Sequence, residues 1–99
     1  AIDQLLTNSR VLDTAPTSLG GQREAELQGG ANLEHRTEPK YDTGDFNDTP
    51  RPGNLRIDYV LPNTGTEVED AGVFWPTRED EAFRLTALYP FPTSDHRLV

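Results

Sequence analysis

The scarcity of large apolar side chains in the first half of the chain constrains the fold most. Residues 13–54 contain four large aliphatic or phenylalanine side chains, which are Leu19, Leu27, Leu33 and Phe46. Prolines and two glycine pairs interrupt the same stretch. A structureless segment of this length within a compact domain is usually functional or disordered. We therefore expect a long polar loop over residues 13–54, in which residues 22–28 form two turns of helix.

The apolar content of the whole chain predicts a weak hydrophobic core. Leu, Ile, Val and Phe make up 22 of the 99 residues, and 13 of these lie in residues 55–99. This fraction is just above the ~20% below which highly charged chains tend to stay disordered. We therefore expect residues 1–99 to form a single segment of a larger domain. The first residue, Ala1, is not methionine, which favours the same interpretation.

Charge and composition exclude several classes of protein. The chain has 17 acidic and 9 basic residues and a formal net charge of -8, which argues against a stand-alone nucleic-acid coat protein. The absence of cysteine excludes a disulfide framework and a thiolate zinc site. No apolar run approaches the ~20 residues that span a bilayer, so we expect no membrane partner.

Hydrophobic periodicity predicts a small α+β fold. Residues 2–12 have a narrow apolar stripe and an acidic first turn, which indicate a helix. Residues 55–61 alternate apolar and polar side chains, as a half-buried strand does. Residues 66–75 and 95–99 are expected to complete a short antiparallel sheet over residues 55–99. The helix over residues 2–12 would pack on one face, and a second short helix would begin near residue 78.

Two short segments carry residues suited to phosphate chemistry. Asp58 lies in the predicted strand, where periodicity alone favours a solvated charge on a half-exposed face. Asp95 and His96 lie where a loop enters the last predicted strand. One interpretation is a turn with a histidine in water. The other is a carboxylate that takes a hard cation beside an imidazole that donates to a phosphoryl oxygen or moves a proton.

Taken together, the two segments are more specific than either one alone. Residues 56–62, Arg-Ile-Asp-Tyr-Val-Leu-Pro, and residues 94–99, Ser-Asp-His-Arg-Leu-Val, resemble the C-terminal part of the endonuclease/exonuclease/phosphatase family. Residues 72–76, Gly-Val-Phe-Trp-Pro, resemble a strand of its bacterial, secreted members. The resemblance covers residues 1–12 and 54–99. It implies a C-terminal fragment at one edge of a four-layer α/β/β/α sandwich, and an extracellular or cell-envelope location.

The resemblance also implies a site. Asp58 would orient His96, His96 would contact the scissile phosphate, and Asp95 would belong to the metal and base group. The expected cofactor is Mg²⁺, or Mn²⁺ or Ca²⁺ in its place. The parent protein would be a metal-dependent phosphoesterase, most simply a nuclease-like phosphodiesterase acting on nucleic acid or a small phosphodiester. The fragment would be inactive without the missing N-terminal part of the domain, and its uncovered sheet face would favour self-association.

A second family-like motif, Gly-Asp-Phe-Asn at residues 44–47, has the wrong spacing from residues 56–62. We interpret it as a chance match within the long loop, so that Asp42, Asp45 and Asp48 are solvated turn residues. The alternative is a loop cation site, which calcium would tolerate with Asn47 as a fourth oxygen donor. We expect His35 to be a solvated loop residue.

The alternative function is a non-catalytic, acidic binding or structural module. Its contact patch would be formed by aromatic residues, namely Phe74, Trp75, Tyr89 and Phe91. We favour core packing for these side chains, because a chain so poor in aliphatic residues needs their buried area. The two hypotheses differ at one contact: the enzyme hypothesis predicts that His96 lies close to Asp58, and the module hypothesis does not.

Overall fold

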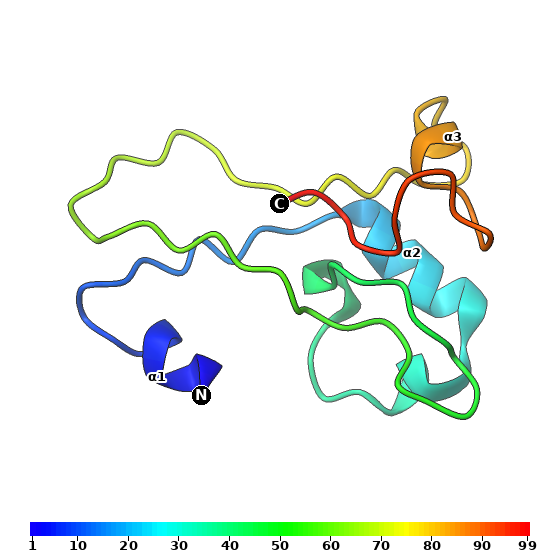
Figure 1. Cartoon of the computed structure of the whole chain (residues 1–99), viewed down its shortest axis with the longest axis horizontal. Coiled ribbons are helices and arrows are strands. Elements are labelled where there is room, and N and C mark those ends of the chain that lie inside the picture. The colour runs from blue at the N-terminus through cyan, green and yellow to red at the C-terminus, as the bar shows by residue number, and fades with distance from the viewer.

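The computed structural model describes all residues from 1 to 99, in a flattened shape with extents of 39 × 29 × 19 Å. Helix α2 (Leu19–Gln28) and the short α3 (Phe83–Thr86) lie toward one end, and α1 (Ile2–Leu6) lies toward the other (Figure 1). Two 3₁₀ helices, η1 (Gly30–Glu34) and η2 (Pro39–Tyr41), follow α2 along the chain. The stretch predicted as a long loop therefore contains three helical elements.

Helix α2 confirms the helix predicted over residues 22–28 and begins three residues earlier. Ser18 is its N-cap, and the Ser18 hydroxyl accepts a hydrogen bond from the backbone N–H of Gly21 at 3.0 Å. The helix ends at Gly29, whose φ of 63° is costly for residues with a Cβ. Gly20 lies so close to the backbone of Trp75 that a Cβ atom would overlap it. The glycine therefore lets α2 pack directly on the segment that carries Trp75.

The helix predicted over residues 2–12 is shorter than expected. It ends at Leu6, with Thr7 as its C-cap. The Asn8 side chain accepts the backbone N–H of Arg10 at 2.9 Å, a local hydrogen bond that competes with the helix. Beyond this turn the chain is extended, and the Leu12 N–H donates to the Pro62 carbonyl at 2.8 Å. The prediction was wrong after Leu6 because local side-chain bonding outweighed a narrow apolar stripe.

The predicted antiparallel sheet is not present as strands. Instead, isolated antiparallel bridges link Gly44 to Leu55, Gly44 to His96, and Phe74 to Leu98, and a fourth bridge joins residues 11 and 63. The predicted segments thus lie in an antiparallel arrangement, but no ladder extends along them. Gly44 bridges both Leu55 and His96, so residues 43–45 lie between the two segments that carry Asp58 and His96.

A side chain interrupts the ladder beside Gly44. The Thr43 hydroxyl oxygen accepts the backbone N–H groups of Ile57 and Asp58 at 3.0 and 2.9 Å. In a regular strand two consecutive N–H groups point to opposite sides, so their convergence on one hydroxyl marks a break in the strand. Regular pairing therefore stops after Leu55, and a period-2 pattern in the sequence cannot reveal that.

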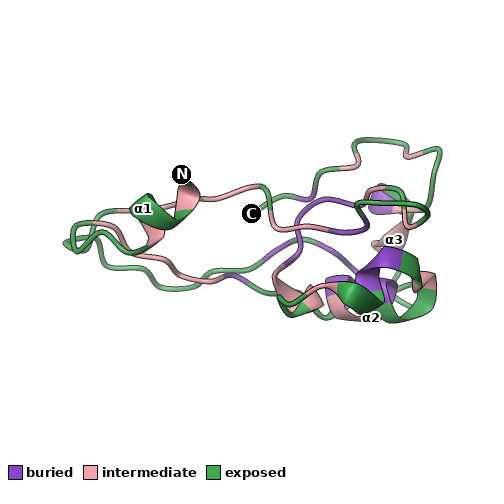
Figure 2. Ribbon diagram, turned by 90° about the horizontal axis from the view of Figure 1, so that it is seen from below, coloured by how far each residue is buried: buried purple, intermediate pink, exposed green.

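The interior is unusually polar, in agreement with the expected weak core. Four hydrophobic residues are buried, and they are Ala25, Ala31, Val73 and Trp75. Eight polar or charged residues are buried as well, and burial concentrates around α2 and the crossing segments beside it (Figure 2). Buried polar groups need partners to avoid a desolvation cost, so hydrogen bonds and ion pairs decide how this chain packs. None of its helices combines the length and apolarity needed to cross a bilayer.

Candidate functional site

His96 and Asp58 are in direct contact. The Nδ1 atom of His96 lies 3.0 Å from each carboxylate oxygen of Asp58. A carboxylate only accepts hydrogen bonds, so Nδ1 must carry a proton. The other ring nitrogen, Nε2, forms no hydrogen bond within the chain and can accept a proton or, when protonated, donate to an anion. This contact is the one that the enzyme hypothesis predicted and the module hypothesis did not.

The backbone of residues 43–45 holds the segment that carries His96. The Asp45 N–H donates to the Asp95 carbonyl at 2.8 Å, and the Arg97 N–H donates to the Thr43 carbonyl at 2.7 Å. These two hydrogen bonds flank His96. The Ser94 hydroxyl also accepts the His96 N–H at 3.0 Å. The backbone of His96 is therefore held on both sides, while its ring remains half-exposed.

The Asp95 side chain lines a different cavity from the one lined by Asp58 and His96. Its half-buried carboxylate forms no hydrogen bond or ion pair, and it lines a cavity of about 440 Å³ together with Asp45 and Asn47. Asp58 and His96 line a separate hollow. Phe46 connects the two, because it lines the first cavity and contacts the His96 ring edge-on, with ring centroids 6.0 Å apart. The structure thus brings two of the three predicted site residues together and places the third beside them.

A buried ion pair lies beneath this site. The Arg97 guanidinium contacts the Asp45 carboxylate at 3.1 Å, and both side chains are almost fully buried. The guanidinium also lies over the rings of Trp75 and Phe91, 4.7 and 5.1 Å from their centroids. Burial raises the pKa of Asp45 and lowers the pKa of Arg97, and the attraction between the two charges opposes both shifts. Through this ion pair, Asp45 holds Arg97, the residue directly after His96, in place.

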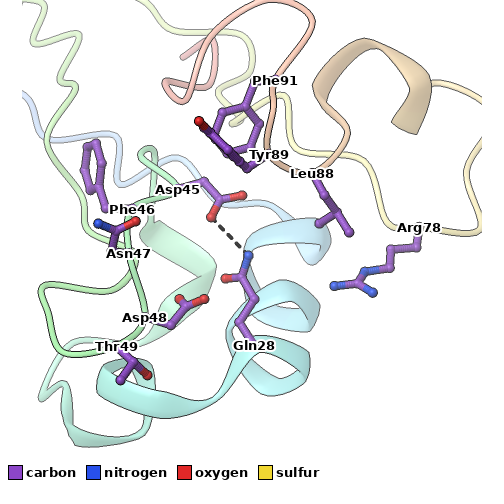
Figure 3. A pocket seen from close by; sticks show the side chains of 10 residues that line it. All are labelled: Gln28, Asp45, Phe46, Asn47, Asp48, Thr49, Arg78, Leu88, Tyr89 and Phe91. Atoms are coloured by element: carbon purple, nitrogen blue, oxygen red, sulfur yellow. Dashed lines mark hydrogen bonds between the residues drawn. The ribbon is translucent and has the colours of Figure 1, made fainter.

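A second cavity, of about 560 Å³, adjoins Asp45 on the side of α2 (Figure 3). Gln28 donates to the Asp45 carboxylate at 3.0 Å across its floor, and Asn54 donates to the oxygen of the same Gln28 side chain at 2.7 Å. Arg78 lines the opposite side and forms two hydrogen bonds, at 2.7 and 3.0 Å, with the buried carboxylate of Glu24. This cation is therefore already neutralised by a partner.

The aspartates of residues 42–48 are not solvated turn residues, as we had interpreted them. Asp42 and Asp45 are 2% and 7% exposed. The Asp48 carboxylate is half-buried and accepts a hydrogen bond from Asn32 at 2.7 Å. Burial raises the pKa of Asp42 to about 6, although the nearby His35 opposes this shift. The interpretation failed because it treated a stretch rich in Asp, Gly and Pro as surface, whereas residues 42–45 are buried and Gly44 bridges both Leu55 and His96.

The alternative loop cation site is not formed either. No three His, Asp or Glu side chains gather in an arrangement that could hold a metal ion. Asp45 is committed to Arg97 and Gln28. Asp95 is compatible with Mg²⁺, because its carboxylate is free and Mg²⁺ takes one or two carboxylates together with waters and substrate phosphate oxygens. The residues present therefore fit an ion held through a single carboxylate.

The expectations for the aromatic residues and for His35 are only partly confirmed. Trp75 is buried, as core packing predicts, whereas Tyr89 is 86% exposed and packs edge-on against Phe91. His35 is half-buried, and its Nε2 atom lies 2.7 Å from the Pro52 carbonyl. A carbonyl only accepts, so His35 carries its proton on Nε2. It is therefore more ordered than the solvated loop residue we expected.

Sequence reasoning missed the contribution of residues 43–47. Thr43, Gly44 and Asp45 connect the segments that carry Asp58 and His96, and Asn47 borders the Asp95 cavity. One signal was available, namely the Gly-Asp-Phe-Asn match at residues 44–47. We set that match aside on spacing, but the fold places these residues directly beside His96.

Comparison with known proteins gives one match. The model of a family described as the endonuclease/exonuclease/phosphatase family matches residues 4–96. The match runs through residues 13–53, which we had expected to lie outside the resemblance. No curated protein and no solved structure gives a significant match.

Proposed function

Because the chain belongs to the endonuclease/exonuclease/phosphatase family, we propose that it forms the phosphate-contacting part of a phosphoester hydrolase. The observation that supports this proposal is the hydrogen bond between His96 and Asp58. It fixes the proton on Nδ1 and leaves Nε2 free. An imidazole held in this way donates from Nε2 to a phosphoryl oxygen once it is protonated.

In the proposed reaction a water attacks phosphorus and the ester oxygen leaves, with negative charge spread over the phosphoryl oxygens. His96 would donate to one of these oxygens and stabilise that charge. Asp58 would keep the ring in its orientation and compensate its positive charge. Asp95 would hold a divalent cation such as Mg²⁺, which supplies charge neutralisation at the phosphate when it is bound.

We propose that the isolated chain binds phosphate but does not turn over a phosphodiester. Groups that act as a unit in catalysis lose nearly all of the rate when some of them are missing. Here the pair formed by Asp58 and His96 is assembled, whereas Asp95 lies on a separate cavity. The C-terminal fragment status, the bacterial and secreted origin, and the extracellular or cell-envelope location remain proposals that rest on the sequence resemblance.

Calorimetric titration with inorganic phosphate tests this proposal. We expect weak binding, with a Kd of about 1 mM, that is lost in His96→Ala and in Asp58→Ala. Mg²⁺ should tighten the binding, and Asp95→Asn should remove that enhancement, whereas Asp70→Asn should not, because Asp70 is exposed and bonds only its neighbour Ala71. Equal phosphate binding by the wild-type and His96→Ala chains would instead favour the acidic binding module.

A chromogenic phosphodiester provides the second test. We expect no Mg²⁺-dependent cleavage by residues 1–99 alone. Cleavage that His96→Ala abolishes would contradict the proposed inactivity while supporting the proposed site. Cleavage that persists in His96→Ala would contradict both.

A further inference from the structure

We infer that Thr43 is the positioning residue that sets the contact between Asp58 and His96. Thr43 is fully buried, and its exposed fraction is 0%. It lies between the segment that carries Asp58 and the segment that carries His96, and it forms hydrogen bonds to both. The inference concerns the assembly of the pair, and only its consequence for phosphate binding rests on the proposed function.

The side chain of Thr43 fixes the backbone at Asp58. Its hydroxyl oxygen accepts from the N–H of Ile57 at 3.0 Å and from the N–H of Asp58 at 2.9 Å. A hydroxyl oxygen has two lone pairs, so both acceptor positions are in use. The N–H of Asp58 belongs to the residue whose carboxylate holds the histidine. The direction in which that carboxylate leaves the backbone therefore depends on this hydroxyl.

The backbone of Thr43 fixes the segment of His96. Its carbonyl accepts the Arg97 N–H at 2.7 Å, and its own N–H donates to the Leu55 carbonyl at 2.9 Å. One residue thus connects both sides of the pair through four hydrogen bonds. The contact between Asp58 and His96 is itself half-exposed, so solvent competes for it, and its persistence depends on how firmly the two backbones are held.

Threonine suits this position for a chemical reason. Valine has nearly the same shape but no acceptor, so Thr43→Val would remove the acceptor from two partly buried N–H groups. Serine retains the hydroxyl oxygen and loses one methyl group. The two substitutions therefore separate the hydrogen bonds from the packing of the side chain.

The test measures ¹⁵N chemical shifts of the histidine rings at alkaline pH, where imidazoles are neutral and the shifts report which nitrogen carries the proton. We expect His96 in the wild-type chain and in Thr43→Ser to carry its proton on Nδ1. In Thr43→Val we expect that preference to be lost, and the Kd for inorganic phosphate to rise about tenfold, as for one lost charge-assisted hydrogen bond. Thr7→Val is the control, because it removes a threonine hydroxyl that bonds a carbonyl, that of Asp3, beside α1, and it should leave His96 unchanged.

A folded Thr43→Val chain with the wild-type His96 shifts would overturn the inference. Amide hydrogen exchange in the wild-type chain extends the test to a case in which Thr43→Val does not fold. The N–H groups of Ile57 and Asp58 should exchange more slowly than the N–H of Val60, for which the structure shows no acceptor. Exchange of all three at one rate would overturn the inference. Failure of phosphate to bind the wild-type chain would instead contradict the proposed function. The histidine ¹⁵N shifts and the amide exchange rates would still test the role of Thr43, because both are measured without phosphate.

Discussion

Replacing Asp42 with asparagine should stabilise the protein at neutral pH. The Asp42 carboxyl is 2% exposed and forms no hydrogen bond or ion pair, so its charged form is poorly solvated. Burial raises its pKa from 3.8 to about 6. A shift of this size corresponds to about 3 kcal/mol of destabilisation once the carboxyl is ionised in both the folded and the unfolded states.

The sign of the pH dependence follows from the direction of the shift. Between the unfolded value of 3.8 and the folded value of about 6, the folded state binds the proton more tightly, so stability falls as the pH rises. The advantage of Asp42→Asn should therefore be about 3 kcal/mol near pH 7.5 and about 1.5 kcal/mol near pH 5. Below both pKa values the advantage should vanish.

Urea unfolding of both chains, followed by Trp75 fluorescence at several pH values, measures this difference. Comparing wild type and variant at each pH isolates Asp42 from the other groups that titrate. The argument that Asp42 is buried without a partner would be refuted if Asp42→Asn were less stable than wild type near pH 7.5. It would also be refuted if the difference in unfolding free energy between the two chains did not change with pH.

Two further substitutions test the packing around the site. Asp45→Asn should cost about 3 kcal/mol in urea unfolding, because it leaves a buried arginine unpaired. Glu34→Gln, which removes an exposed ion pair, should cost less than about 1 kcal/mol, and equal losses would contradict the buried pair. Gly20→Ala should lower the thermal midpoint by several degrees or prevent folding, because its Cβ would overlap backbone. Gly65→Ala, in an open turn, should have little effect, and an unchanged midpoint for Gly20→Ala would contradict the close packing of α2.

Part of the fold follows from local sequence. Helix α2 has an N-cap serine at its start and a glycine just past its end, and those signals are local. The contact between Asp58 and His96 was predicted from a family resemblance, since no periodicity in the chain places residues 58 and 96 together. The helix prediction thus rests on one segment, whereas the contact rests on two segments that resemble the family only when they are taken together.

The central role of residues 43–45 could not be predicted in the same way. Glycine and aspartate are common in turns, so their local preference indicates a loop. Their position between two distant segments depends on a threonine hydroxyl acting as a backbone acceptor and on the buried pair of Asp45 with Arg97. Such non-local polar contacts leave no periodic pattern, and they also replace the regular strands that the alternation of residues 55–61 had indicated.

Phosphate titration followed at the two histidine rings by NMR tests the central claim most directly. His96 and His35 have opposite hydrogen bonds, through Nδ1 to Asp58 and through Nε2 to Pro52, and His35 serves as an internal reference. We predict that inorganic phosphate shifts the His96 ring signals saturably and leaves those of His35 unchanged. Equal shifts at both rings, or no shift at His96, would contradict the proposal that Asp58 and His96 form a phosphate-contacting site.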